Sequence, residues 1–528
     1  MDLFNSSAFA THVTELMNQW HVPGLAIAIV QNETIASKGF GNASLNNMVP
    51  VTADTLFDIA STSKSLTAAS VALLIANNDA YPQVQWNSTM SSLLPEDFIL
   101  SGNGYTENVT LEDILSHRTG LPGHDNSLLS VRAAYPDTPS SVTRNLRHLE
   151  ASAPVRTRFM YSNMMYTVAT FLVEKMSDLY FGDFLHKHFF SPLGMNSTYL
   201  QPSAAIDAGL KDRIATPYTW HKVNKSYKPI QLLQCPEGQG AGSIYTSAND
   251  YIKWVRALMN QEDPISQEIY RDLIKPRIIE NPDDEIGEFG PMSSPTFYSA
   301  GWEPIYYHGY KIIQHNGVVP GFGSFHFFLP EFKFGGIAVG NSIWANPVST
   351  YVLLELISEV LNLSGSDNKA WTLLSKSPDR LSDLRSEHDD LKQKLCPGID
   401  EAQPQKTPLT AYTGNYWNVG YHYMSVEIRD SMLFINATDR SNAFTLTFEH
   451  ICKQTKYIAH IRDHYEEFFD DSTIAEFIFE DGRAVKMGIK LEDELDSLVW
   501  FEKLETASFT DQSDCCDEGA VEASSRDS

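Results

Sequence analysis

The strand-like segments of residues 1–364 lie near the two ends of that region, with mostly helical sequence between them. Near the start, an apolar run at 25–30 and a second segment at 34–41 flank a polar turn, which is the pattern of a hairpin. Near the far end, segments at 324–330 and 335–341 flank another turn. Because both ends supply strands, we predict an α+β fold in which an antiparallel sheet is formed from both ends of the region and flanked by helices.

Helices are predicted between and beside these strands. The segment at 66–76 is apolar on every side, which is typical of a helix buried at the centre of a domain. Further helices are predicted at 9–20, 164–178, 248–260 and 350–362. Residues 1–364 are therefore predicted to form one domain.

The character of the sequence changes after residue 364. Residues 365–405 combine polar segments with a Lys/Asp/Glu-rich helical stretch, and they are predicted to be a linker. Residues 406–504 hold short alternating or apolar segments separated by turns, which predicts a small antiparallel β-barrel or sandwich. The acidic tail at 505–528 has few large apolar residues and is predicted to be disordered.

Charge limits the partners of the chain. It carries 66 Asp and Glu against 39 Lys and Arg, a net charge of −27. This excess repels phosphate backbones and anionic lipid surfaces, so we expect no nucleic acid and no membrane as partner. The N-terminal segment lacks the basic and apolar pattern of a signal peptide, and no apolar stretch is long enough to span a membrane.

These patterns predict a cytoplasmic protein, with secretion as the alternative if the N-terminus is incomplete. Nine N-x-S/T sequons, which matter only in an exported chain, keep that alternative open; they lie at Asn5, Asn32, Asn42, Asn87, Asn108, Asn196, Asn224, Asn362 and Asn436. The oligomeric state is left open.

The cysteine and histidine patterns favour neither a metal nor a cofactor. No pair of the five cysteines has C-x-x-C spacing, so neither a zinc site nor a disulfide framework is predicted. His186 and His188 would point to different sides of a helix, and the glycine-rich segment at 335–340 lacks the βα unit that follows a dinucleotide-binding loop. We therefore expect no metal and no cofactor.

Ser61-x-x-Lys64 lies directly before the apolar helix at 66–76. Residues three apart share one side of a helix, so the two side chains are expected to meet. Free backbone N–H groups at a helix start favour negative charge on a bound carbonyl, and a desolvated lysine can act as a base. The alternative is a helix-capping serine beside a solvated lysine. A second copy, Ser366-x-x-Lys369, lies in the linker without an apolar helix behind it.

Two further motifs lie where a site residue can be held rigidly. Tyr161-x-Asn163 stands where a strand or turn gives way to an apolar helix. His315-x-Gly317 stands in a strand whose glycines allow its backbone to approach a ligand closely. Taken singly, the tyrosine is equally typical of packing with its hydroxyl at the surface, and the histidine of a structural or exposed position.

Together, Ser-x-x-Lys, Tyr-x-Asn and His-x-Gly in this order resemble the serine β-lactamase/penicillin-binding-protein superfamily. The branch that the chain resembles is the class C β-lactamase-like serine hydrolases, peptidase family S12, in which His-x-Gly replaces a lysine-threonine-glycine motif. The resemblance covers about residues 9–362, and residues 406–504 resemble the lipocalin-like barrel that follows this domain in some S12 peptidases. Supporting stretches are HVPGLAIAIV, TLEDILSHRTGLPG, FFSPLGMNSTYL, GAGSIYTSANDYIKWVRALMN, YSAGW and HNGVVPGFGS.

The resemblance implies a role for each motif residue. Ser61 would be the nucleophile that forms an acyl-enzyme, Lys64 would take its proton, and Tyr161 would act with Lys64 as general base and then as general acid. Asn163 would orient Lys64 or the substrate amide. His315 would shape the proton network or contact a substrate carboxylate.

The resemblance also implies an oxyanion hole formed by the backbone N–H groups of Ser61 and Val318, beside Gly317. A neutral histidine anchors a carboxylate less well than lysine does, which argues against avid binding of β-lactam antibiotics.

The function implied is that of a serine hydrolase that cleaves an ester or amide bond, including a peptide bond, in a small-molecule or peptide substrate. One alternative is an acyltransferase or peptide cyclase of secondary metabolism that uses the same acyl-enzyme. The other is a non-catalytic scaffold on the same fold, which the intact Ser61, Lys64 and Tyr161 disfavour. The barrel is interpreted as a structural or oligomerisation module, or as the source of a loop that narrows the cleft.

Overall fold

The computed structural model describes residues 1–528 except 284–288, 291, 364–383, 400 and 506–528. A seven-stranded antiparallel sheet lies at the centre of the first region, in the order β11-β12-β13-β14-β1-β2-β3. Strand β1 near the N-terminus pairs with β14 near the end of the region, with Ile27 opposite Ala338. The predicted sheet built from both ends is therefore confirmed. Its strands are β1 (Gly24–Gln31), β2 (Thr34–Ser44), β3 (Val49–Pro50), β11 (Glu303–Tyr307), β12 (Tyr310–Val319), β13 (Phe322–Leu329) and β14 (Phe334–Gly340).

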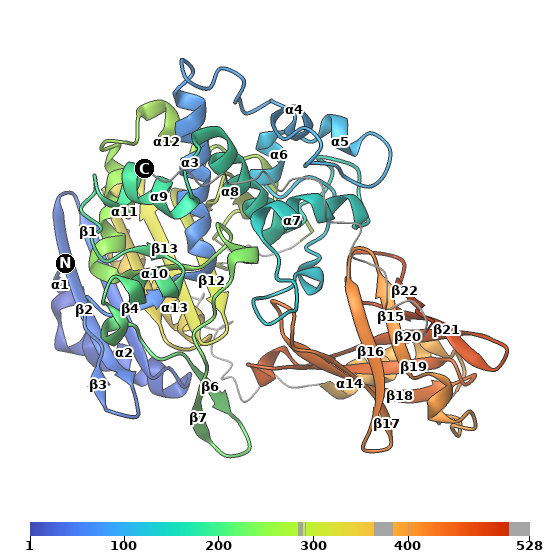
Figure 1. Cartoon of the computed structure of the whole chain (residues 1–528). Helices are drawn as coiled ribbons and strands as arrows, with labels where there is room; N and C mark the ends of the chain where they lie inside the picture. Colours follow the sequence, from blue (N-terminus) through green and yellow to red (C-terminus); the bar gives the residue numbers. More distant parts are fainter. Residues whose placement is uncertain (284–288, 291, 364–383, 400, 506–528) are drawn as a thin grey trace, which may run out of the picture.

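Helices cover both faces of this sheet (Figure 1). Alternate residues of β1 belong to different cores, because successive side chains of a strand point to opposite faces. Leu25, Ile27 and Ile29 belong to the core that includes helices α2 (Ser7–Gln19) and α13 (Ala345–Val360). Ala26, Ala28 and Val30 belong to the core that includes α3 (Lys64–Ala76), α8 (Asn163–Ser177) and α11 (Ala248–Asn260).

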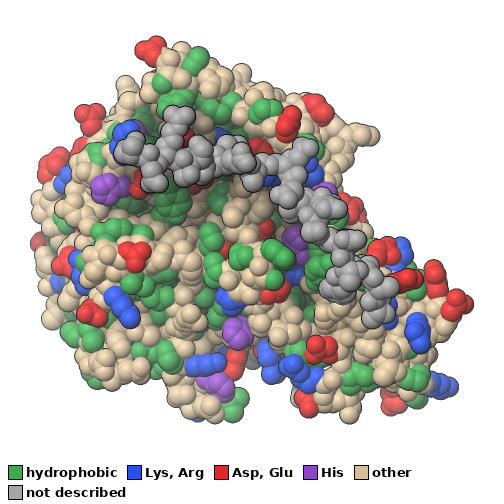
Figure 2. Space-filling view, in the orientation of Figure 1, with side chains coloured by type: hydrophobic (Ala, Val, Ile, Leu, Met, Phe, Trp, Pro, Cys, Tyr) green, Lys and Arg blue, Asp and Glu red, His purple; other side chains and the backbone are tan. Residues whose placement is uncertain are grey.

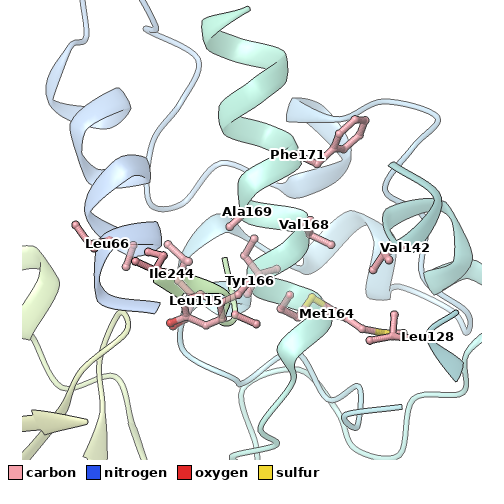
Figure 3. Close-up of a cluster of buried hydrophobic side chains, with 14 of the residues drawn as sticks. Leu66, Leu115, Leu128, Val142, Met164, Tyr166, Val168, Ala169, Phe171 and Ile244 are labelled. Carbon is pink, nitrogen blue, oxygen red and sulfur yellow. The ribbon is translucent and has the colours of Figure 1, made fainter. Parts of the chain in front are cut away.

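The predicted helices all form. The helix predicted at 350–362 begins earlier, at Ala345, because Pro347 lies in its first turn, where a missing N–H is tolerated. Helix α3 is buried nearly throughout, as its uniform apolar composition predicts. Figure 3 shows Leu66 of α3 and Tyr166 of α8 meeting Leu115 and Ile244 in the core between the two helices.

Eight antiparallel strands of the C-terminal region form a closed barrel, which confirms the barrel prediction. Closure comes from pairing of the first and last strands, with Tyr416 opposite Lys503. The strands are β15 (Gly414–Asn418), β16 (His422–Arg429), β17 (Met432–Ala437), β18 (Phe444–Cys452), β19 (Lys456–Asp463), β20 (Asp471–Glu480), β21 (Arg483–Ile489) and β22 (Val499–Lys503).

The cysteine prediction was wrong at one pair. Cys396 and Cys452 form a disulfide across 56 residues of sequence, and it joins the end of helix α14 (Leu384–Leu395) to strand β18. A small apolar cluster that includes Leu395, Ile451 and Ile458 surrounds the bond. Spacing alone gave no signal, because the barrel brings the two cysteines together from distant positions in the sequence. Residues 365–383 and 400 of the predicted linker, and the tail after Glu505, lie outside the described residues.

Charged side chains of both signs are interspersed over the face of the molecule in Figure 2, including over the barrel. Within the described ranges, none of the helices has the length and apolar character needed to cross a membrane.

Candidate active site

Ser61 lies in a short turn between strand β4 (Leu56–Asp58) and helix α3. This turn is the 3₁₀ segment η1 (Ala60–Ser63). Ala60 has a φ of +50°, a conformation that L-residues rarely adopt, and its N–H donates to Asp58 Oδ1 at 2.7 Å. Burial raises the pKa of Asp58 to about 7. The backbone just before Ser61 is thus strained and held in place by a buried carboxyl group.

Lys64 is fully buried and directly beside Ser61. Its Nζ lies 3.0 Å from Ser61 Oγ, 2.8 Å from Asn163 Oδ1 and 2.9 Å from the Ala241 carbonyl oxygen. Burial lowers the pKa of Lys64 to about 7, although Asp125 and Glu303 oppose this shift. The lysine can therefore shed its proton near neutral pH, which a solvated lysine cannot.

The partners of Lys64 decide which way its lone pair points. Two of them, Asn163 Oδ1 and the Ala241 carbonyl, are pure acceptors. A neutral amine has two N–H donors and one lone pair, so both donors are taken by these oxygens. The lone pair is left facing Ser61 Oγ, which is the orientation that removes the hydroxyl proton.

Asp125 is a site residue that the sequence analysis missed. Its Oδ2 accepts a hydrogen bond from Asn163 Nδ2 at 2.9 Å, and this bond turns Asn163 Oδ1 toward Lys64. Burial raises the pKa of Asp125 to about 6, while Asn163 and Lys64 favour its ionised form. No motif marks Asp125 in the sequence, because it reaches the site from a separate segment, as the first residue of the 3₁₀ turn η2 (Asp125–Ser127).

Tyr161 also contacts Lys64. Lys64 Nζ is 4.8 Å from the centre of the Tyr161 ring, and the Ser61 side chain partly offsets the effect of burial on the Tyr161 pKa. Burial raises the pKa of Tyr161 well above its usual value of 10, so the phenol keeps its proton at neutral pH. The hydroxyl is placed to donate a proton near Ser61.

Strand β12 passes beside Ser61. Beyond Gln314, the edge of β12 that faces away from β13 has none of the described strands paired to it in the sheet. Its pairing with β11 ends at Gln314 opposite Glu303, and the following residues run along η1. Gly317 is required there, because a Cβ at this position would lie 2.9 Å from Ser61 N and 2.7 Å from the Ile59 carbonyl oxygen. Val318, the next residue, is partly exposed and lines the cleft.

His315 lies behind the site, with only 1% of its surface exposed. One ring nitrogen is 2.6 Å from the Asn316 carbonyl oxygen, and the other is 3.0 Å from the Tyr298 hydroxyl and 3.5 Å from Glu303 Oε1. Burial lowers the pKa of His315 to about 3, so the ring is neutral. Of its two expected roles, this position favours shaping the network over contact with a substrate carboxylate.

Ser61, Asn163 and Val318 open onto a cleft of about 480 Å³. Its acidic lining residues are Asp58, Asp125, Glu237, Asp463 and Asp471. Among the described lining residues, Arg132 is the one with a permanent positive charge, and its guanidinium donates to the carbonyl oxygens of Thr438 and Arg440. Apolar lining comes from both domains and includes Leu128, Leu233, Phe322, Phe444, Ile461, Tyr465 and Phe469.

The barrel forms one wall of this cleft and contacts the first domain on two sides. On one side, Ser130 N–H donates to the Asp439 carbonyl, and Ser441 N–H donates to the Leu128 carbonyl. On the other side, Glu466 accepts hydrogen bonds from Thr219 and Gly321. These contacts favour the interpretation in which the barrel narrows the cleft over that of a solely structural or oligomerisation module.

A second Tyr-x-Asn sequence, Tyr416-Trp417-Asn418, does not join the site. Tyr416 is buried in the barrel, where its hydroxyl donates to the Tyr412 carbonyl oxygen. Ser366 and Lys369 lie outside the described residues.

Comparison with known proteins agrees with this fold. The chain belongs to the beta-lactamase family, whose model matches residues 9–343. A second family model, described as a domain of unknown function, matches residues 400–503.

Two curated relatives are unguisins hydrolases from Aspergillus species. The protein from Aspergillus violaceofuscus is 35% identical over 467 residues, which cover 84% of this chain and 81% of the relative. The protein from Aspergillus campestris is 33% identical over 445 residues, covering 83% and 81%. These relatives place the chain in a family of serine hydrolases.

Solved structures share the fold at lower identity. The octameric penicillin-binding protein homologue from Pyrococcus abyssi matches 94% of this chain and 100% of its own, with 18% identity and a TM-score of 0.59. The D-amino acid amidase from Ochrobactrum anthropi SV3, complexed with L-phenylalanine amide, matches 68% and 99%, with 21% identity and a TM-score of 0.54. At these identities the likeness establishes the fold alone.

Proposed function

We propose that this chain hydrolyses an amide or ester bond through an acyl-enzyme formed on Ser61. The observation that carries the proposal is the hydrogen bonding of Lys64, whose two acceptor partners leave its lone pair facing Ser61 Oγ. A buried amine with a pKa near 7 is matched to general-base catalysis at neutral pH.

In the first half-reaction, Lys64 takes the Ser61 proton as Oγ attacks the substrate carbonyl. The negative charge on the carbonyl oxygen is stabilised by the backbone N–H groups of Ser61 and Val318. Tyr161 donates its proton to the leaving amine or alcohol, and the Lys64 ammonium replaces that proton. Water then attacks the ester on Ser61 and loses a proton to Lys64, which returns that proton to Ser61 Oγ as the acid is released.

The cleft favours a substrate without a carboxylate beside the scissile bond. Five acidic residues line it, whereas the Arg132 guanidinium is engaged by barrel carbonyls and His315 is neutral and buried. A substrate carboxylate would meet carboxyl groups that repel it wherever they are ionised, and it would find no cation in the described lining that is not already hydrogen-bonded. This favours neutral peptides, amides and esters, and unguisins are the natural substrates to test because the two relatives are named for them.

Reaction with a fluorophosphonate probe tests the nucleophile. Intact mass spectrometry and peptide mapping should find one adduct, on Ser61, which Ser61→Ala abolishes. Ser441→Ala, which removes another serine of the cleft lining, is the matched control and should label normally. An adduct on another residue, or none on folded protein with several probes, would refute the assignment.

A matched pair of substrates tests the charge preference. Hydrolysis of a neutral p-nitrophenyl ester is compared with that of the same ester carrying a carboxylate on its acyl group. We expect kcat/KM to be at least about 10-fold higher for the neutral ester, since a charge mismatch of about 1.4 kcal/mol is a factor of ten. Equal values would rule out the proposed selectivity and leave the Ser61 assignment untouched.

A further inference from the structure

The turn between β12 and β13 contains Pro320 and Gly321, with Val319 paired to Phe322. Gly321 has a φ of +76°, and a Pro-Gly pair with positive φ at glycine is the signature of a type II turn. Two-residue hairpins prefer the mirror-image turn types, because types I and II do not follow the natural twist of the strands. The turn after the Ser61-facing strand is therefore of a type that is uncommon in two-residue hairpins.

Glu466, from the barrel, accepts a hydrogen bond that holds this turn. It lies between β19 and β20 and is 2% exposed. Its Oε1 accepts the Gly321 N–H at 3.0 Å, and its Oε2 accepts the Thr219 hydroxyl at 2.6 Å. Thr219 lies on β6 (Tyr218–His221), so one barrel carboxylate joins the turn to a second element of the first domain.

The barrel segment that carries Glu466 is itself held in one conformation. The N–H groups of Tyr465 and Glu466 both donate to Asp463 Oδ1, at 2.7 and 2.8 Å. Two neighbours of Glu466 also contact the first domain. Glu467 Oε1 lies 3.3 Å from His221 Nε2, and the Phe468 ring packs against Trp344 with centroids 4.8 Å apart.

We propose that Glu466 is a positioning residue through which the barrel fixes the β12–β13 turn, and with it the Val318 N–H beside Ser61. The proposal rests on the proposed function, because Val318 matters to the rate only if its N–H stabilises an oxyanion. Val318 lies three residues before Gly321 on the same strand and turn, and both Val318 and Pro320 line the cleft. The barrel thereby contributes to catalysis without supplying a reacting group.

Glu466→Ala removes both hydrogen bonds and leaves the Gly321 N–H without its acceptor. On a small neutral ester we expect kcat to fall between about 10- and 100-fold, because loss of a whole oxyanion donor costs about 10²–10³. KM should change by less than about threefold, because the small substrate does not reach the barrel wall. Glu466→Gln keeps an acceptor for Gly321, and the Thr219 hydroxyl can turn to accept from the new amide, so most of the rate should return.

Glu467→Ala is the matched control, since this neighbour in the same segment contacts a half-exposed histidine away from the cleft. It should keep the wild-type kcat. If Glu466→Ala does not fold, Thr219→Val removes one of the two bonds from the other side and should lower kcat by a smaller factor. Wild-type kcat in folded Glu466→Ala, or the same loss in Glu466→Gln as in Glu466→Ala, would overturn the proposal.

Labelling separates this proposal from the proposed function. Given long incubation with the fluorophosphonate, Ser61 in Glu466→Ala should still reach one adduct per chain, because the nucleophile is intact. Absence of the Ser61 adduct in the wild type would instead remove the proposed function itself. A labelled wild type with an unaffected Glu466→Ala rate would remove only the positioning role.

Discussion

At the scale of single residues, four side chains define the surroundings of Ser61. Asp125 fixes the Asn163 amide, Asn163 and the Ala241 carbonyl occupy the two donors of neutral Lys64, and the remaining lone pair faces Ser61. The proton of Ser61 therefore has one acceptor whose pKa lies near 7. Tyr161, whose pKa is raised by burial, keeps its proton at neutral pH.

Lys64→Arg should abolish turnover although it preserves the positive charge. Arginine keeps its proton at every pH used to assay an enzyme, so the variant has a cation but no base. We expect kcat to fall by about 10²–10⁴, the usual contribution of general-base catalysis. Steady-state hydrolysis of a neutral ester, with circular dichroism to confirm folding, is the measurement. An active Lys64→Arg enzyme would mean that another group is the base.

The pH dependence of kcat/KM should reflect Lys64. The neutral amine is the active form, so the rate should rise as pH increases through about 7 and level off above it. Asp125 favours the lysine cation, so Asp125→Asn should shift this rising limb to lower pH while keeping an acceptor for Asn163. Rate profiles between pH 5 and about 9 test both statements. An unmoved limb in Asp125→Asn would show that the carboxylate does not act on Lys64.

At the scale of elements, the site depends on how closely β12 approaches the turn that holds Ser61. Gly317→Ala places a Cβ within 3.0 Å of three atoms, two of which belong to the backbone, so strand and turn must separate. We expect kcat to fall by about 10²-fold, the effect of a misplacement of about 1 Å. Gly309→Ala is the control in the turn at the other end of β12. Its φ of +86° makes it destabilising, but a Cβ there meets no neighbour, so kcat should be kept.

The disulfide is an element-scale constraint on the barrel. Replacing Cys396 and Cys452 by serine frees a segment of 56 residues, which the chain-entropy relation converts to about 4 kcal/mol of unfolding free energy. The bond lies among apolar residues of the barrel rather than in the cleft, so the variant should unfold at a lower denaturant concentration with kcat unchanged. An unchanged midpoint under non-reducing conditions would contradict this expectation.

At the scale of the whole molecule, the barrel and the first domain together form the substrate cleft. Phe469 lines it from the barrel and is 40% exposed. Phe469→Ala should raise KM for a large peptide substrate by about 10-fold or more, because burying a phenyl ring contributes about 1.5–3 kcal/mol. KM for a small ester should not change. Ile478→Ala, on an exposed barrel position outside the lining, is the control. Equal effects on large and small substrates would argue against a specificity wall.

The sequence predicted the parts of this arrangement that local patterns determine. Uniform burial of α3 follows from its apolar composition, and the sheet follows from strands at both ends of the region. Short motifs identified Ser61, Lys64, Tyr161 and Asn163, because the residues of each motif lie within three positions of one another.

Contacts between distant segments could not be predicted. Asp125 reaches Asn163 from a loop without a motif, and Glu466 reaches Gly321 from another domain. Cys396 and Cys452, 56 residues apart in sequence, are brought together by the fold rather than by any local pattern. The burial of His315 depends on its neighbours Tyr298 and Glu303, which the residues around the histidine do not reveal.

The most direct test of the account is to trap the covalent intermediate itself. The chain is mixed with a neutral p-nitrophenyl ester, quenched in acid at early times and weighed intact by mass spectrometry. The account predicts a mass increase of one acyl group, located on Ser61 by peptide mapping, which rises and decays with turnover and is absent from Ser61→Ala. Turnover by Ser61→Ala at the wild-type rate, or an acyl group on a different residue, would contradict it.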